Sequence, residues 1–239
     1  MSAPLTKWKV LPHGRLTAVE DDILTVVGEI TMLVGKLSRR MTVVRLKDRR
    51  LVVFSAIALD EHEMRALEDF GEPAFLIVPS DHHRLDARIW RDRYPAMQVI
   101  TPPGARDKVE KAVLVDATEV DFGDPDVRFI TVPGTSGHEA ALEVSGPTGT
   151  TLVLNDIVGN IRDSSGVSGW FLRLMGFAGD EPHVPLPVKA AMIDNKAALA
   201  GQLRRWADLP SLKRIVVSHG ETIDRDPQGA LRELAKTLE

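Results

Sequence analysis

Residues 74–83 read AFLIVPSDHH: five apolar residues, a proline and four polar residues. A short apolar run between Pro73 and Pro79 is typical of a strand buried on both faces of a sheet. The polar residues then fall at the carboxyl end of that strand, where α/β sheets place their sites because the loops there diverge. His82 and His83 are therefore candidate site residues.

Two later apolar strands end in the same way. Residues 151–156 (TLVLND) bring Asp156 to a strand end, and residues 214–220 (RIVVSHG) bring His219. Each piece alone also fits a structural role, as a helix N-terminus, a turn or the end of a strand. Together, two or three histidines and one carboxylate from separate strand ends form the ligand set of a zinc, iron or manganese centre. The coincidence favours a metal site.

The composition is that of a soluble globular protein, with 239 residues of which 44% are hydrophobic and 27% charged. We expect one domain over residues 1–239. A formal net charge of -4, with both signs scattered, argues against nucleic-acid binding through a basic surface. No apolar run approaches the roughly 18–20 residues of a membrane-spanning helix, and the N-terminus lacks a secretory signal, so we expect a cytoplasmic protein. Because the chain has no cysteine, any metal must be held by histidine, carboxylate or backbone oxygen ligands.

Hydrophobic periodicity and turn residues predict a mixture of strands and helices. Residues 41–47 and 51–57 are expected to form a hairpin, and a helix follows Asp60, whose spacing to Glu63 is that of a capping box. Further strands are predicted at residues 74–78, 97–101, 127–132, 140–144, 151–154 and 214–217, and further helices at about 85–93, from 105, at 188–207 and at 227–238. This order predicts a mixed α/β sandwich.

Residues 159–187 are rich in glycine and proline and carry several large apolar side chains. A long excursion of this kind is typical of a lid. We expect Trp170, Phe171 and Phe177 to contact a substrate there, and packing of the lid onto the sandwich is the alternative role for at least some of them.

Nucleophilic catalysis is the competing chemistry. Residues 134–138 (GTSGH) bring a serine close to a histidine, but the G-x-S-x-G spacing and the strand-to-helix context are missing. The sequence contains no G-x-x-x-x-G-K-[ST] loop and no G-x-G-x-x-G motif, so a nucleotide cofactor has no support.

Four segments carry a family resemblance: residues 41–57 (MTVVRLKDRRLVVFSAI), 77–104 (IVPSDHHRLDARIWRDRYPAMQVITPPG), 132–161 (containing VPGTSGHEAALEV and TLVLNDIVGNI) and 216–223 (VVSHGETI). In this order and spacing they resemble the metallo-β-lactamase-like hydrolase fold family, and within it a divergent bacterial and plant branch. The resemblance covers about residues 5–225. It implies an α+β fold, a four-layer αββα sandwich of the metallo-β-lactamase type, with a metal site along one edge.

The sequence departs from the family pattern at one of its two metal positions. Familiar members carry a His-x-His-x-Asp-His signature, whose last two positions fall here on His82 and His83. The first two positions fall on Val78 and Ser80, and the histidine of the family's Pro-Gly-His turn is replaced by Thr135. The resemblance therefore implies that three ligands of one metal position are lost together.

The other metal position keeps its ligands, with a histidine where the family has aspartate. It would be lined by His82, His83, Asp156 and His219. A single divalent transition metal, zinc or iron first and manganese as a third choice, is the cofactor that this set implies. His138 either replaces a lost ligand or hydrogen-bonds within its own turn, and both alternatives remain open.

The resemblance implies a metal-dependent hydrolase of a small ester, thioester, lactone or phosphoester, in which Asp156 or Asp81 orients the water. The rival hypothesis is a metal-free, inactive member that serves as a ligand-binding or interaction module. A third alternative is docking of a lipid or a partner through an exposed aromatic patch at residues 170–177. The expected partner is a small-molecule substrate, with no nucleic acid and no membrane, and a homodimer is compatible with the sequence.

Overall fold

The structure is a computed structural model that describes residues 3–31, 36–161, 182–185, 188 and 192–239. The chain forms two compact units: the first comprises Met1–Ile30 and Ser38–Pro125, and the second comprises Thr31–Leu37 and Asp126–Glu239. Each unit encloses its own hydrophobic core. The expectation of a single domain over residues 1–239 stays a prediction. Within the described part of the chain, no helix is long and apolar enough to cross a membrane.

The first unit is built on a six-stranded mixed sheet. Its strands follow one another in space as β1-β2-β3-β4-β5-β6. Their bounds are β1 Thr17–Glu20, β2 Ile23–Thr31, β3 Lys36–Arg45, β4 Arg50–Phe54, β5 Glu72–Ile77 and β6 Gln98–Ile100. The predicted hairpin is confirmed, because β3 and β4 pair in antiparallel fashion with Thr42 opposite Phe54. β4, β5 and β6 are parallel, so the segment after β5 leaves the sheet at a carboxyl edge.

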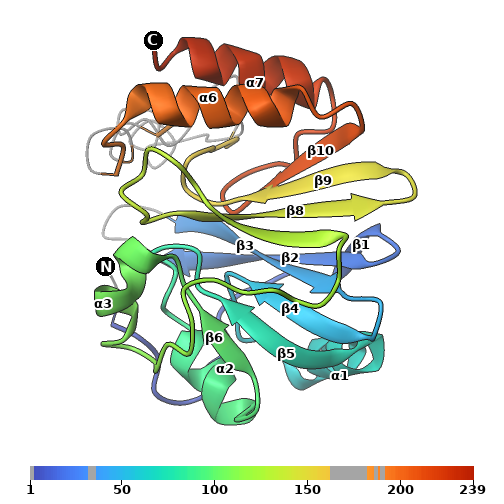
Figure 1. The fold of residues 1–239 in the computed structure, drawn as a ribbon. Coiled ribbons are helices and arrows are strands. Elements are labelled where there is room, and N and C mark those ends of the chain that lie inside the picture. The colour runs from blue at the N-terminus through green and yellow to red at the C-terminus, as the bar shows by residue number, and fades with distance from the viewer. Residues whose placement is uncertain (1–2, 32–35, 162–181, 186–187, 189–191) are drawn as a thin grey trace. The chain divides into compact units, whose positions relative to one another are not determined.

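The helices of the first unit are α1 (Glu61–Phe70), α2 (Ala87–Arg93), η1 (Pro103–Ala105) and α3 (Arg106–Val109), and α1 and α2 lie on one face of its sheet (Figure 1). Asp60 caps α1 as predicted, since its side chain accepts the backbone N–H groups of His62 and Glu63. Glu63 does not complete the capping box. Its carboxylate instead accepts the backbone N–H of Leu16 at 2.8 Å, which ties the helix to the N-terminal segment.

The second unit has a four-stranded mixed sheet in the order β10-β9-β8-β7. Its strands are β7 Val127–Thr131, β8 Ala140–Gly146, β9 Gly149–Leu154 and β10 Leu212–Val217. β10 runs parallel to β9, whereas β8 is antiparallel to both of its neighbours, β7 and β9. The chain is thus an α+β protein with two mixed sheets and flanking helices.

Two helices, α6 (Lys196–Ala207) and α7 (Pro227–Lys236), cover the second sheet side by side (Figure 1). α6 begins at Lys196, where Asn195 acts as its N-cap and accepts the backbone N–H of Ala198. Val188, at the start of the predicted helix, is also helical, residues 189–191 are not described, and residues 192–195 are not helical. The predicted lid at residues 159–187 lies largely outside the described residues. Trp170, Phe171 and Phe177 all fall there.

Candidate metal centre

In the second unit, Asp156 and His219 lie side by side. Leu154 ends β9, Val217 ends β10, and these two residues are partners in the parallel pairing. Asp156 and His219 each follow two positions later, so they leave the sheet at the same edge. Oδ1 of Asp156 lies 3.2 Å from Nε2 of His219, and their side chains are 11% and 12% exposed.

This spacing fits two ligands of one metal ion. Donor atoms at about 2.0–2.1 Å from a tetrahedral metal stand about 3.3 Å apart. A carboxylate oxygen and an imidazole nitrogen are also donors that zinc, iron and manganese accept. In the absence of a metal, the same contact is an ion pair whenever the imidazole of His219 is protonated. The donor set of this pair is therefore compatible with a divalent transition metal.

The turn that carries His219 is fixed against residues 159–161. The backbone N–H of Asn160 donates to the carbonyl oxygen of His219 at 3.0 Å, and the N–H of Glu221 donates to the carbonyl oxygen of Asn160 at 2.9 Å. Gly220 adopts φ +103°, a conformation that side chains rarely allow. Backbone contacts therefore fix the turn from which the His219 side chain extends.

A buried glutamate fixes the turn that carries Asp156. Glu139 precedes β8 and is fully buried. Its carboxylate oxygens accept the backbone N–H of Ile157 and the side-chain amide of Asn155, both at 3.3 Å, so Glu139 braces the turn on each side of Asp156. Burial and the negative charge of Asp156 raise the pKa of the Glu139 carboxyl well above its ordinary value.

The turn at residues 133–138 carries Thr135, at the position where the family that the sequence resembles has a histidine. Thr135 is fully buried, and its hydroxyl donates to the carbonyl oxygen of Val132 at 2.7 Å. The backbone N–H of His138 donates to the carbonyl oxygen of Thr135 at 2.8 Å, and the His138 residue is half-buried. The Thr135 hydroxyl is thus committed to its own turn. A ligand role for His138 stays a prediction.

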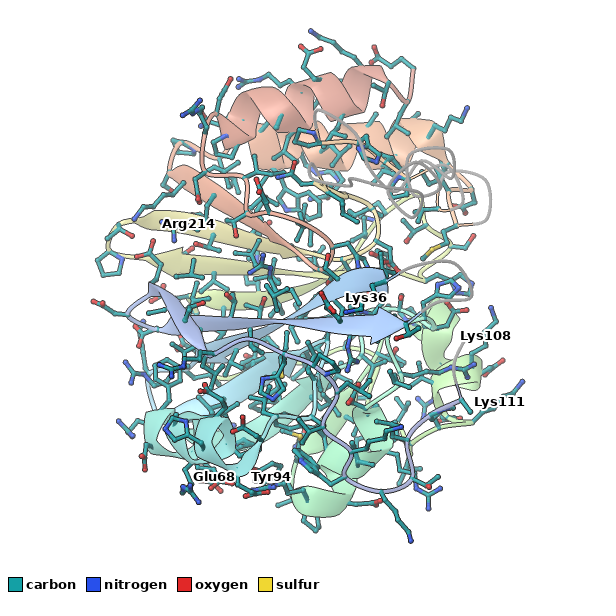
Figure 2. The ribbon with its side chains drawn as sticks, turned by 180° about the vertical axis from the view of Figure 1, so that it is seen from behind. Lys36, Glu68, Tyr94, Lys108, Lys111 and Arg214 are labelled. Atoms are coloured by element: carbon teal, nitrogen blue, oxygen red, sulfur yellow. The ribbon has the colours of Figure 1, made fainter. Side chains whose placement is uncertain are left out.

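In the first unit, the segment after β5 carries the other candidate residues. The carboxylate of Asp81 forms an ion pair with Nζ of Lys108, a residue of α3 that is labelled in Figure 2. The same carboxylate lies 3.1 Å from Nδ1 of His82, and the side chain of Asp81 is only 3% exposed. His82 is 41% exposed, so this contact turns Nδ1 inward while much of the imidazole faces solvent.

The same segment is fixed at two further points. Nδ1 of His83 lies 2.7 Å from Oγ of Ser55, which directly follows β4. Asp86, at the start of α2, is buried, forms an ion pair with Arg39 and accepts the backbone N–H of Ala58 at 3.0 Å. Side chains from β3, α3 and the end of β4 therefore hold the loop that carries the two histidines.

Sequence reasoning missed Glu139, Ser55 and the pair of Arg39 with Asp86. The available signal was a polar residue inside or next to an apolar run, as in residues 137–144 (GHEAALEV) and 51–57 (LVVFSAI). Such residues are buried only at a cost unless they find partners. Their partners lie 16 to 47 residues away in the sequence, so the pattern alone does not identify them.

No protein-family model matches the sequence, and no curated protein matches it. Solved structures do match. The metallo-β-lactamase from Hirschia baltica has a TM-score of 0.61 at 9% identity, covering 94% of this chain and 98% of that one. The metallo-β-lactamase FIM-1 from Pseudomonas aeruginosa, in a mono-zinc form, has a TM-score of 0.62 at 11% identity, covering 96% and 97%.

A third match, the metallo-β-lactamase from Erythrobacter litoralis, has a TM-score of 0.63 at 12% identity, covering 93% of this chain and 96% of that one. Such identities are evidence of a shared fold and not of a shared activity. They are also consistent with a divergent branch, as the sequence predicts. The chain therefore has the metallo-β-lactamase-like fold.

Proposed function

We propose that this chain is a metal-dependent hydrolase that binds one divalent transition metal through Asp156 and His219. The observation that carries the proposal is the 3.2 Å separation of their donor atoms at the common edge of two parallel strands. Zinc and iron are the first candidates and manganese the third. The mono-zinc form of a structurally similar metallo-β-lactamase is a precedent for a single metal on this fold.

The turn at residues 133–138 supports the single metal. The family histidine of that turn is replaced by Thr135, which is fully buried and donates its hydroxyl to Val132. A hydroxyl committed in this way is a poor substitute for an imidazole ligand. His138, three residues further on, is the remaining candidate for a replacement ligand in this turn.

The remaining ligands in the proposal come from the first unit. His83 and His82 are proposed on the sequence pattern, as the last two positions of the family signature. Nδ1 of His83 already contacts Ser55 and Nδ1 of His82 contacts Asp81. In both imidazoles, Nε2 is therefore the nitrogen proposed to bind the metal.

A bound divalent metal lowers the pKa of water to about 7 and polarises a carbonyl or phosphoryl oxygen. The chain must then orient the water and hold its proton. Asp156 is the better candidate for this role, because Asp81 is 3% exposed and pairs with Lys108. The proposed substrate is a small ester, thioester, lactone or phosphoester, and no nucleic-acid partner is proposed.

Elemental analysis tests the proposal. Protein purified without a metal-affinity tag is compared with His219→Ala, Asp156→Asn, His83→Ala and the control His62→Ala, whose imidazole is 79% exposed on α1. We expect close to one zinc, iron or manganese per chain in the wild type and in the control. The His219 and Asp156 variants should lose it, and loss in His83→Ala would assign a ligand to the first unit.

Activity on esters, thioesters, lactones and phosphoesters is then screened with the loaded wild type and the His219 variant. Hydrolysis that disappears with the metal supports the proposal. A wild type without metal, even after incubation with zinc, iron and manganese, contradicts it and favours the inactive ligand-binding or interaction module.

A further inference from the structure

Ser55 has a strained backbone inside the first unit. It is the first residue after β4, and its φ is +58°. This left-handed region is uncommon for serine because the Cβ crowds the following carbonyl group. Ser55 is 4% exposed, so packing inside the unit imposes the conformation. A residue held in a strained conformation by its surroundings is a physical reason to look for a function.

The contacts of Ser55 connect that strain to His83. The backbone N–H of Ser55 donates to the carbonyl oxygen of Ile77 at 3.0 Å and so ties the end of β4 to the end of β5. Its Oγ then lies 2.7 Å from Nδ1 of His83. The backbone N–H of His83 donates to the carbonyl oxygen of Ser80 at 3.2 Å, which fixes the loop on the other side of the contact.

This contact restricts the chemistry that His83 can offer. A hydroxyl occupies Nδ1, so a metal can reach the ring only through Nε2. Metal-binding histidines commonly donate the N–H of the other ring nitrogen to an oxygen, which fixes the tautomer and the orientation of the ring. The Oγ of Ser55 stands where such an acceptor is needed.

We propose that Ser55 is a positioning residue for His83: it accepts the Nδ1–H of the imidazole and holds the tautomer that presents Nε2 to the metal. This inference rests on the proposed function. A glycine would adopt the same backbone conformation without strain, so the hydroxyl is the part of Ser55 that the inference concerns.

The test separates the hydroxyl from the backbone. Ser55→Gly relieves the positive φ but removes the hydroxyl contact with His83, and because these two effects oppose each other, the thermal unfolding midpoint of the metal-free variant should stay close to that of the wild type. Arg49→Gly is the control, because Arg49 is an exposed residue at φ +70° in the turn between β3 and β4, outside the candidate centre. Zinc affinity is measured by competition with a chromophoric chelator. We expect a loss of about 10–100-fold for Ser55→Gly and no change for Arg49→Gly.

A second readout observes the tautomer directly. Long-range ¹H–¹⁵N correlation spectra of the zinc-loaded protein, assigned with His83→Gln, report which ring nitrogen carries the proton. The inference requires Nδ1–H in the wild type, with Nε2 showing the shift of a metal ligand. If Ser55 served only the stability of the fold, Ser55→Gly would change the unfolding midpoint and would still bind zinc as tightly as the wild type.

The failures of the two proposals are distinguishable. A wild type that binds no zinc contradicts the proposed function and this inference with it. A wild type that binds zinc, with Ser55→Gly binding it equally tightly or with His83 protonated on Nε2, overturns the inference alone.

Discussion

Gly220 lies so close to Asn160 that a Cβ at position 220 would stand 2.1 Å from the Asn160 carbonyl oxygen. The contact belongs to the turn that places His219 beside Asp156. Both backbone hydrogen bonds of Asn160 across this turn, to His219 and to Glu221, require the two segments to approach at this distance. The absence of a side chain at position 220 is therefore a condition for the geometry of the candidate centre.

We expect Gly220→Ala to lower the free energy of unfolding by about 1–3 kcal/mol, because alanine meets both the positive φ and the backbone clash. Metal binding should weaken in the same variant as the turn shifts. Urea denaturation with and without metal measures both effects. Gly201→Ala, in the interior of α6, is the control: its Cβ would meet only Arg205 at 3.7 Å, so a gain of up to about 1 kcal/mol is expected. Equal stability of Gly220→Ala and the wild type would contradict the argument.

Tyr94 is the only tyrosine of the chain, so the ionisation of its phenol can be followed without a signal from another tyrosine. Its hydroxyl donates to the Glu68 carboxylate at 2.5 Å, and both residues are labelled in Figure 2. Partial burial and this hydrogen bond raise the pKa of Tyr94 above its ordinary value of about 10. The ultraviolet absorbance of the phenolate should therefore rise only above that pH while circular dichroism shows the fold intact.

In Glu68→Gln the phenol loses its charged acceptor but stays partly buried, so the pKa of Tyr94 should fall and still exceed about 10. The urea-denatured protein provides the reference for an unperturbed tyrosine. If the pKa of Tyr94 in the folded wild type equals that in the denatured protein, the contact with Glu68 is refuted.

The sequence predicted the strands whose ends carry the candidate site residues, because an apolar run flanked by proline or polar turn residues is compatible with few structures other than a buried strand. It did not predict β1 and β2. β2 alternates buried and exposed residues only in part, and Gly28 interrupts it. The helix predicted over residues 188–207 is also interrupted, because residues 192–195 are not helical and α6 starts anew after its N-cap Asn195.

For the candidate centre, the sequence identified residues but not the contacts that hold them. Asp156 and His219 were singled out because each comes two residues after the end of an apolar strand. Glu139 and Ser55 were missed because their partners are distant in the sequence and become neighbours only when strands pair. A pattern along the chain indicates candidate ligands at strand ends, whereas the groups that contact them come from the packing of the sheet.

Glu139 predicts a pH dependence of stability with a definite sign. Its folded-state pKa is raised above the unfolded value of about 4.3, first by burial and then by Asp156. Its contribution to stability is therefore fully present below that value and is lost as the pH rises toward the folded-state pKa. In the presence of a chelator, the free energy of unfolding of the wild type should fall with rising pH relative to Glu139→Gln.

Glu139→Leu is the companion variant. Neither substitution leaves a titratable group, so the two variants should show the same pH dependence with different offsets. We expect Glu139→Gln to lower the free energy of unfolding by about 1–3 kcal/mol relative to the wild type at low pH. The amide nitrogen of the introduced glutamine cannot accept a hydrogen bond, so one of the two groups that donate to Glu139 loses its acceptor. Urea denaturation across the acidic and neutral range measures all three proteins, and a wild-type curve parallel to both variants would rule out the raised pKa.

The buried pair of Arg39 and Asp86 fixes the end of the loop that carries His82 and His83. Their side chains are 8% and 0% exposed, and Asp86 also accepts the backbone N–H of Ala58. Removing one partner leaves the other charge buried and uncompensated. We therefore expect Arg39→Met to lower the free energy of unfolding by about 3–5 kcal/mol.

The double variant Arg39→Met with Asp86→Asn should lose less than the sum of the two single losses, because neither charge is then left alone. The exposed pair of Arg88 and Asp92 on α2 provides the matched control, and Arg88→Met should cost at most about 0.5 kcal/mol. Urea denaturation of the four proteins of the cycle gives the coupling energy. Additive losses would mean that the pair does not hold the loop, and so would an Arg39→Met variant that loses no more stability than Arg88→Met. The orientation of His83 would then depend on the contacts of Ser55 with His83 and of Lys108 with Asp81.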